Sequence, residues 1–147
     1  MECYLRPACL EDIDLFYEWV NDPLVRKNSF HTDLIPRENH VSWFEKALGD
    51  VNVVIYVLME GAAPVGQIRF NLDGDVAEID YSISPQNRGR GLGRKILSLG
   101  IDAIKKDRPQ VCRVIGQVKP GNKASASCFI ENGFAEIFTQ FEYSVKE

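Results

Sequence analysis

The fold of this chain is decided by one stretch, from Tyr81 to Lys95, which reads Y-S-I-S-P-Q-N-R-G-R-G-L-G-R-K. In the run that leads into it, Ala77 to Ser84, apolar and polar residues alternate, and a period of two is typical of a half-buried strand. From Leu92 to Lys106 the apolar residues recur instead at helical spacing. Pro85 and three glycines lie between the two patterns. The stretch therefore predicts a strand, a glycine-rich loop and a helix in succession.

The predicted loop has the composition of a phosphate site. Its glycines leave N–H groups bare where the helix begins, and the positive end of the helix dipole attracts anions. A Walker A loop is excluded, because Gly93 is followed by R-K-I and not by Lys and then Ser or Thr. The spacing G-x-G-x-G in mid-chain also departs from the dinucleotide fingerprint. What remains is R-x-x-G-x-G, at Arg88, Gly91 and Gly93, or an ordinary strand–helix turn.

Length and composition are those of one soluble globular domain, which we expect to span residues 1–147. The chain has 147 residues, of which 45% are hydrophobic and 26% charged. Its net charge of −4 argues against nucleic-acid binding. We expect no membrane span and no signal peptide, and hence a cytoplasmic protein. The four cysteines form no C-x-x-C pair, so we expect reduced thiols and neither a metal site nor a disulfide framework.

Taken in order, the chain predicts a mixed α/β fold with a mostly antiparallel central sheet flanked by helices. Strands are expected at 4–7, 51–59, 65–72, 76–84 and 111–118, with two short closing pieces between Phe134 and Val145. Helices are expected at 10–20, 36–49, 92–106 and from Asn122 to Asn132-Gly133, with a polar loop at 24–35. Asp73-Gly74-Asp75 predicts a tight hairpin. The crossover helix at 92–106 makes the strands on either side of it parallel.

A second motif follows in the segment Asn122 to Phe134, N-K-A-S-A-S-C-F-I-E-N-G-F. Together with E-I-D-Y-S-I-S-P and R-G-R-G-L-G, in this order along essentially the whole chain, it resembles the GCN5-related N-acetyltransferase (GNAT) superfamily. The resemblance implies the GNAT fold, acetyl-CoA as co-substrate, no metal, and coenzyme A in a gap of the sheet. It implies cofactor contacts from Ile83, Ser84, Arg88, Gly89, Arg90, Gly91, Leu92, Gly93, Arg94, Asn122, Ser125 and Phe129. For Asn122, helix capping alone is the alternative.

Acetyl transfer to an amine requires a base for the amine proton and a proton for the leaving thiolate. Glu78 and Asp80 are the candidate bases, because they alternate along one face of the strand that leads to the cofactor. The resemblance favours Glu78 over Asp80, because relatives with a similar E-x-x-Y strand use the glutamate as base. Many relatives carry a tyrosine where this chain has Phe129, which cannot donate a proton. Ser125 lies one helical turn before it and is the candidate donor to sulfur. Solvent-facing positions are the alternative for each, and Tyr81 and Tyr143 are weaker donor candidates.

The acceptor is expected to meet the region between the first two helices. There N-D-P-L-V-R-K-N-S-F and E-N-H-V-S-W resemble enzymes that acetylate the 4-amino group of UDP-linked deoxy-amino sugars, as in pseudaminic acid pathways. The expected acceptor-binding residues are Arg26, Lys27, His31, His40, Trp43 and Tyr81. An acetyltransferase for ribosomal-protein N-termini or other small amines is the competing enzyme. The alternative that is not an enzyme is a non-catalytic acetyl-CoA-binding module, which the missing tyrosine suggests. A homodimer is left open.

Overall fold

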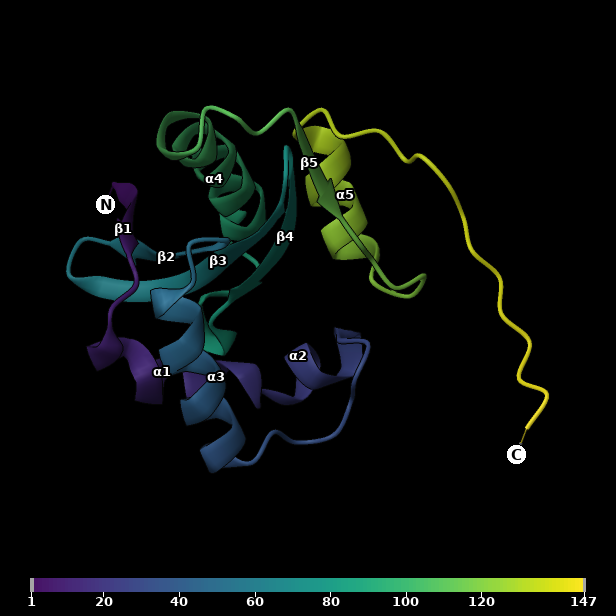
Figure 1. Cartoon of the computed structure of the whole chain (residues 1–147), viewed down its shortest axis with the longest axis horizontal. Helices are drawn as coiled ribbons and strands as arrows, with labels where there is room; N and C mark the ends of the chain where they lie inside the picture. Colours follow the sequence, from purple (N-terminus) through teal and green to yellow (C-terminus); the bar gives the residue numbers. More distant parts are fainter. Residues whose placement is uncertain (1, 147) are drawn as a thin grey trace.

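The computed structural model describes residues 2–146 as a five-stranded sheet with helices on both faces (Figure 1). The strands are β1 (Cys3–Pro7), β2 (Val53–Glu60), β3 (Ala63–Asp73), β4 (Val76–Ile83) and β5 (Arg113–Gly116), in the spatial order β1-β2-β3-β4-β5. The helices are η1 (Leu10–Asp12), α1 (Ile13–Val20), α2 (Pro23–Asn28), α3 (Arg37–Gly49), η2 (Pro85–Asn87), α4 (Leu92–Asp107) and α5 (Lys123–Glu131). The predicted mixed α/β class is confirmed.

Each face of the sheet has its own apolar core. Helices α1 and α3 cover one face, where Phe16, Trp19 and Phe44 pack against β2. Helix α4 covers the other face through Ile96, Leu97 and Ile104, with α5 alongside. Figure 1 shows the sheet between these two helical layers. Any group on β4 therefore reaches one layer or the other according to whether its number is odd or even.

The hairpin between β3 and β4 sets the register that builds the site. Asp73 pairs with Val76, so that Asn71 lies opposite Glu78 and Arg69 opposite Asp80. The next pair, β4 and β5, is parallel, as the crossover helix required, and its pairing ends at Ile79 and Gly116. Beyond this point β4 continues for four residues while β5 stops. A gap therefore opens in the sheet between the two strands.

Two predictions at the level of elements are wrong. The polar loop expected from Leu24 onward begins as helix α2, because Asp22 accepts hydrogen bonds from the amides of Leu24 and Val25 and Pro23 suits the first helical turn. The closing strands expected between Phe134 and Val145 are absent from the structure, which describes this segment through residue 146. It runs away from the body (Figure 1).

The physical reason is the lack of a partner for that segment. Its large apolar side chains, Ile137, Phe138, Phe141, Tyr143 and Val145, are between 68% and 92% exposed. Alternation of apolar and polar residues forms a strand only where a neighbouring backbone and an apolar surface receive it. Within residues 2–146, no helix is long and apolar enough to cross a membrane.

Candidate active site

The glycine-rich loop presents free amide groups at the start of α4. Gly89 and Gly91 have φ values of 78° and 75°, a left-handed conformation that glycine adopts without steric cost. Gly91 is the N-cap of α4, and no side chain caps the amides of the first turn. The first hydrogen bond of the helix backbone runs from Lys95 N–H to Gly91 O at 3.3 Å. The amides of residues 92–94 therefore have no partner within the helix, the arrangement in which a helix start can bind an anion.

The three arginines of the loop and the first turn of α4 are held by acidic residues of other elements. Arg88 donates from Nη2 to Asp22 Oδ2 at 2.7 Å, and Arg90 donates from Nη2 to Glu60 Oε2 at 2.6 Å. Arg94 forms an ion pair with Glu131 of α5. These arginines fix the loop against α2, β2 and α5, so their positive charge reaches an anion mainly through the local field and not as free side chains.

Below the loop, the edge of β4 is open on the side of the gap. The amide of Ser84 donates to Val65 O at 2.9 Å and so points toward β3. Because backbone groups alternate along a strand, the N–H and C=O groups of Tyr81 and Ile83 point toward the gap. Ser84 is buried, and its hydroxyl accepts a hydrogen bond from Asn87 at 2.7 Å. Of the predicted docking pair, Ile83 thus offers the free backbone and Ser84 supports the turn.

Tyr81 and Ser125 meet across the gap. The Tyr81 hydroxyl lies 2.8 Å from Ser125 Oγ and joins β4 to α5. Burial raises the pKa of Tyr81, so the phenol keeps its proton. Asn122 accepts a hydrogen bond from the Ser125 amide at 3.2 Å and is the N-cap of α5. Tyr81, expected on the acceptor side, therefore lies beside the expected sulfur-side donor.

Phe129 serves the core of the molecule. Its ring packs edge-on against Tyr81, with centroids 5.9 Å apart, and against Phe134 at 4.9 Å. A Cβ on Gly116 would lie 2.4 Å from Phe129 Cζ, so the tip of the ring presses on β5. The glycine at 116 makes room for this ring. Phe129 is buried, and a hydroxyl at its Cζ would meet β5 before it met a ligand.

The two acidic candidates line a small pocket on the opposite face of the sheet. Glu78 and Asp80 extend toward the α1–α3 side, since they alternate with Ile79 and Tyr81. The pocket has a volume of about 180 Å³ and is lined by Phe30, Arg69, Asn71, Glu78, Ile79, Asp80 and Gln117. The expected base and the expected sulfur-side donor thus lie on opposite faces of the sheet, at the level where β4 and β5 separate.

The sequence interpretation missed three polar residues of this face, Gln67, Arg69 and Asn71. They alternate along β3 and, in the register set by the hairpin, lie opposite Ser82, Asp80 and Glu78. Gln67 donates to Asp80 at 3.3 Å and to Ser82 at 3.2 Å. The signal was present in the sequence: a tight hairpin fixes which residues face each other, and Q-I-R-F-N alternates in the same way as E-I-D-Y-S.

Two expected acceptor residues are occupied by the fold itself. Arg26 is 9% exposed, and its guanidinium donates to the carbonyls of Val20, His31 and Asp33 and to Ser29 Oγ. His40 is 3% exposed and its Nε2 lies 2.8 Å from Ile13 O, so this nitrogen carries the proton. Arg26 holds the segment after α2, and His40 joins α3 to α1.

Three other expected acceptor residues, Lys27, His31 and Trp43, are exposed. In the sequence, Lys27 precedes and His31 follows Phe30, which lines the small pocket of Glu78 and Asp80. Trp43 of α3 is 40% exposed, and the Arg69 guanidinium lies over its ring, 4.9 Å from the centroid.

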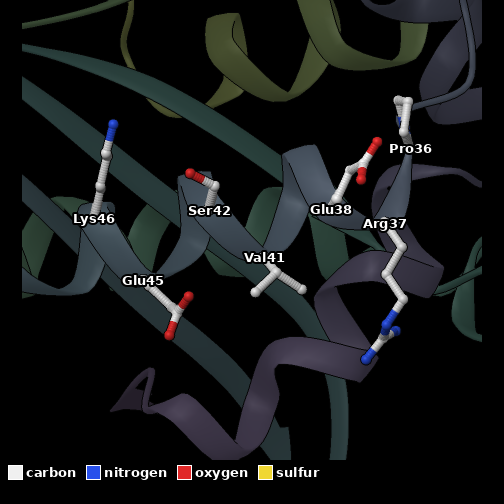
Figure 2. A pocket seen from close by; sticks show the side chains of 7 residues that line it. All are labelled: Pro36, Arg37, Glu38, Val41, Ser42, Glu45 and Lys46. Carbon is white, nitrogen blue, oxygen red and sulfur yellow. The ribbon is translucent and has the colours of Figure 1, made fainter.

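A larger open hollow, of about 940 Å³, follows the outer side of α3 (Figure 2). It is lined by Pro36, Arg37, Glu38, Val41, Ser42, Glu45 and Lys46, and Arg37 reaches to an ion pair with Asp14 of α1. These side chains are solvated and lie away from the gap between β4 and β5. Among residues 2–146 no group of three or more His, Cys, Asp or Glu side chains could hold a metal ion.

Comparison with known families gives a match to the acetyltransferase (GNAT) domain over residues 3–135. The chain belongs to this family. The fold prediction, the activity class of an acetyl-CoA-dependent N-acetyltransferase and acetyl-CoA as co-substrate are thereby confirmed. A search of curated proteins found no sequence that matches the chain.

Solved structures share the fold at low sequence identity. The aminoglycoside acetyltransferase AAC(6')-Ib, in complex with ribostamycin and coenzyme A, matches with a TM-score of 0.80 at 20% identity, over 92% of this chain and 84% of that one. Spermidine N-acetyltransferase from Vibrio cholerae, in complex with CoA and spermine, gives 0.84 at 16% identity, over 92% and 82%. A domain from Methanocaldococcus jannaschii gives 0.81 at 22% identity, over 96% and 93%.

Proposed function

We propose that this GNAT domain transfers the acetyl group of acetyl-CoA to a primary amine in the gap where β4 and β5 separate. The observation that carries the proposal is the end of strand pairing at Ile79 and Gly116. The unpaired end of β4 then leads through the glycine-rich loop to the uncapped amides of α4. The pyrophosphate of the co-substrate would lie on the amides of Gly89 to Gly93. Its pantetheine arm would pair with the backbone of Tyr81 and Ile83 on the open edge of β4.

The chemistry divides between the two faces of the sheet. Glu78 takes a proton from the ammonium form of the acceptor, directly or through a water. The neutral amine then attacks the thioester carbonyl, and the C–S bond breaks as the amide forms. The Ser125 hydroxyl gives its proton to the leaving sulfur and regains one from the attacking nitrogen, so the nitrogen loses two protons in all. Tyr81 keeps its proton and holds Ser125 in place.

For the acceptor we propose the 4-amino group of a UDP-linked deoxy-amino sugar. Support comes from the segment around Phe30, because Phe30 lines the pocket of Glu78 and Lys27 and His31, close to it in sequence, are exposed. Lys27 suits a diphosphate and His31 a sugar hydroxyl. The exposed Trp43 ring, which lies against Arg69 of the same pocket, offers a flat apolar surface. Arg26 and His40 are left out, because their polar groups already have internal partners.

A small cationic amine is the second candidate, and the observation that favours it is the pair of carboxylates in the pocket. Glu78 and Asp80 would attract a polyamine or an aminoglycoside. The structural neighbours named above were solved with spermine and with ribostamycin. An N-terminal peptide amine belongs to the same group of acceptors.

The test is release of free CoA thiol from acetyl-CoA in the presence of UDP-linked 4-amino sugars, polyamines, aminoglycosides and peptides. We expect the highest kcat/KM with the nucleotide sugar. A preference for polyamines by tenfold or more would replace the proposed acceptor by the second candidate. Binding of acetyl-CoA without thiol release for any acceptor would contradict catalysis and point to a non-catalytic acetyl-CoA-binding module.

A further inference from the structure

Arg69 is a cation of the acceptor pocket whose hydrogen-bonding capacity is largely unused. Its side chain is half-buried on β3 and lies over the Trp43 ring, 4.9 Å from the centroid. Its Nε is buried and has no hydrogen-bond partner among residues 2–146. Its Nη1 lies 3.8 Å from Asp80 Oδ2, which is longer than a hydrogen bond. The guanidinium is therefore fixed in position by Trp43 while its donors have no close acceptor.

The surroundings give this arginine a distinct place in the pocket. Among the residues that line the pocket, it is the one cation, and Glu78 and Asp80 are the two acids. Asn71 and Gln117 add neutral polar groups, and Phe30 and Ile79 add apolar ones. A pocket built for a polycation gains nothing from a guanidinium held beside its carboxylates, since like charges repel. A molecule that carries both signs of charge can pair with both kinds of group.

A purely internal role is the alternative, in which Arg69 only offsets the charge of Asp80. The geometry does not favour it. An arginine that serves a carboxylate inside a protein normally forms two short parallel hydrogen bonds, as Arg6 does with Asp12 at 2.8 Å for both contacts. Between Arg69 and Asp80 the single ion pair is 3.8 Å long, and the Asp80 side chain is 54% exposed.

We propose that Arg69 binds an oxyanion of the acceptor, a phosphate or a carboxylate, while Glu78 receives the amine of the same molecule. This inference rests on the proposed function, because it takes the pocket of Glu78 as the acceptor site. It names the substrate class more closely: an amine that carries an anionic group about one sugar ring away. UDP-linked amino sugars belong to this class, whereas polyamines and aminoglycosides do not.

The test compares matched acceptors on two variants, Arg69→Met and Arg69→Lys. The acceptors are a UDP-linked 4-amino-4,6-dideoxy sugar, its methyl glycoside without the diphosphate, an ω-amino acid, and spermidine. For Arg69→Met we expect KM for the diphosphate acceptor to rise about 10- to 100-fold, the loss of one charge-assisted contact. KM for the methyl glycoside and for acetyl-CoA should stay within about twofold. Arg69→Lys keeps the charge without the fork and should lie between.

The matched control is Arg113→Met, which removes one positive charge from an exposed position of β5 outside the pocket. It should leave every KM unchanged. A larger rise for the ω-amino acid than for the nucleotide sugar would identify a carboxylate as the bound group. An equal rise for all acceptors, or a lower KM for the nucleotide sugar, would overturn the proposal.

Failure of the proposed function can be told apart from failure of this inference. If no acceptor is acetylated, calorimetric binding of the UDP-linked amino sugar to wild type, Arg69→Met and Arg69→Lys still tests Arg69 directly. Weaker binding to Arg69→Met supports the oxyanion site even without turnover, and equal binding to all three rejects it. Melting temperatures of the variants check folding, and Arg69→Lys keeps the contact with Trp43 should Arg69→Met prove unstable.

Discussion

Glu78 lies next to the last residue of β4 that is still paired with β5, and it lines the small pocket. If this carboxylate takes the amine proton, an amide in its place cannot do so. We expect Glu78→Gln to lower kcat/KM by about 10²- to 10⁴-fold. Acetyl-CoA affinity should not change. The measurements are kcat/KM for acetyl transfer and acetyl-CoA binding by both proteins.

Asp80→Asn is the control for this prediction, because Asp80 is on the same face and also lines the pocket. Its loss should cost less than that of Glu78. Should Asp80→Asn instead show the larger rate loss, the base would be Asp80.

The hydroxyls of Tyr81 and Ser125 lie 2.8 Å apart. A double-mutant cycle can therefore measure whether the two act together. If Tyr81 acts through Ser125, Tyr81→Phe and Ser125→Ala should each slow acetyl transfer roughly tenfold, the cost of one hydrogen bond. The double variant should be no slower than the slower single variant. Tyr81→Phe keeps the ring against Phe129, so the melting temperature should barely change. Independent, multiplying losses would mean that the two hydroxyls do not act as a unit.

At the scale of elements, the loop before α4 can be separated from ordinary backbone effects. Gly91→Glu places a carboxylate where the pyrophosphate is expected, at a left-handed position with open space around it. The strain costs about 1–2 kcal/mol, which a folded domain tolerates. We expect the variant to remain folded and to lose the rise in melting temperature that saturating acetyl-CoA gives, roughly 5–10 °C at 100 times Kd.

Gly74→Glu is the matched control for the loop. Its φ of 62° and open surroundings impose the same kind of strain, but it lies in the hairpin between β3 and β4. It should keep the full acetyl-CoA shift. A normal shift in Gly91→Glu would remove the phosphate from this loop.

Elements whose signals are local could be predicted from the sequence. Two examples are the strand–loop–helix from Ala77 to Lys106 and the hairpin at Asp73-Gly74-Asp75. Their signals are alternation, helical spacing and glycine, which can be recognised in residues close together in the sequence. Helix α2 was missed although its Asp-Pro start was visible. The segment from Phe134 to Val145 alternates like a strand, but whether a partner receives it depends on the rest of the fold.

The same distinction explains the candidate site. Glu78 was placed on the correct strand because β4 alternates, and Ser125 near the gap because α5 starts at Asn122. Arg26 and His40 looked equally suitable as polar residues, but both are buried and hydrogen-bonded to backbone carbonyls, Arg26 to residues five to seven positions away and His40 to Ile13. Arg69 was overlooked because its place in the pocket depends on pairing between two strands. Neither the residue type nor the local spacing predicts which residue of another strand an arginine will lie opposite.

At the scale of the whole molecule, one ion pair joins the glycine-rich loop to the start of α2. Asp22 caps α2 and also accepts a hydrogen bond from Arg88 of the glycine-rich loop. Burial by itself would raise the pKa of Asp22, but the hydrogen bonds from Arg88, Val25 and Leu24 outweigh it and the pKa is lowered. A lowered pKa in the folded state stabilises the protein above the unfolded value of about 3.9. This contribution is lost as the pH falls through the folded value.

We therefore expect Asp22→Asn, which can still cap α2, to destabilise the protein by about 1–2 kcal/mol at pH 7 through loss of the ion pair. The difference from wild type should shrink as the pH falls below about 4, since protonated Asp22 loses the same charge. Urea unfolding at several pH values measures both effects.

Because the pair holds α2 against the loop, KM should rise for acetyl-CoA and for the acceptor together. Arg88→Met should reproduce these changes, and adding it to Asp22→Asn should cost little more if the two residues act as a pair. A stability difference that stays constant from pH 7 to pH 3 would show that Asp22 acts through packing and capping alone.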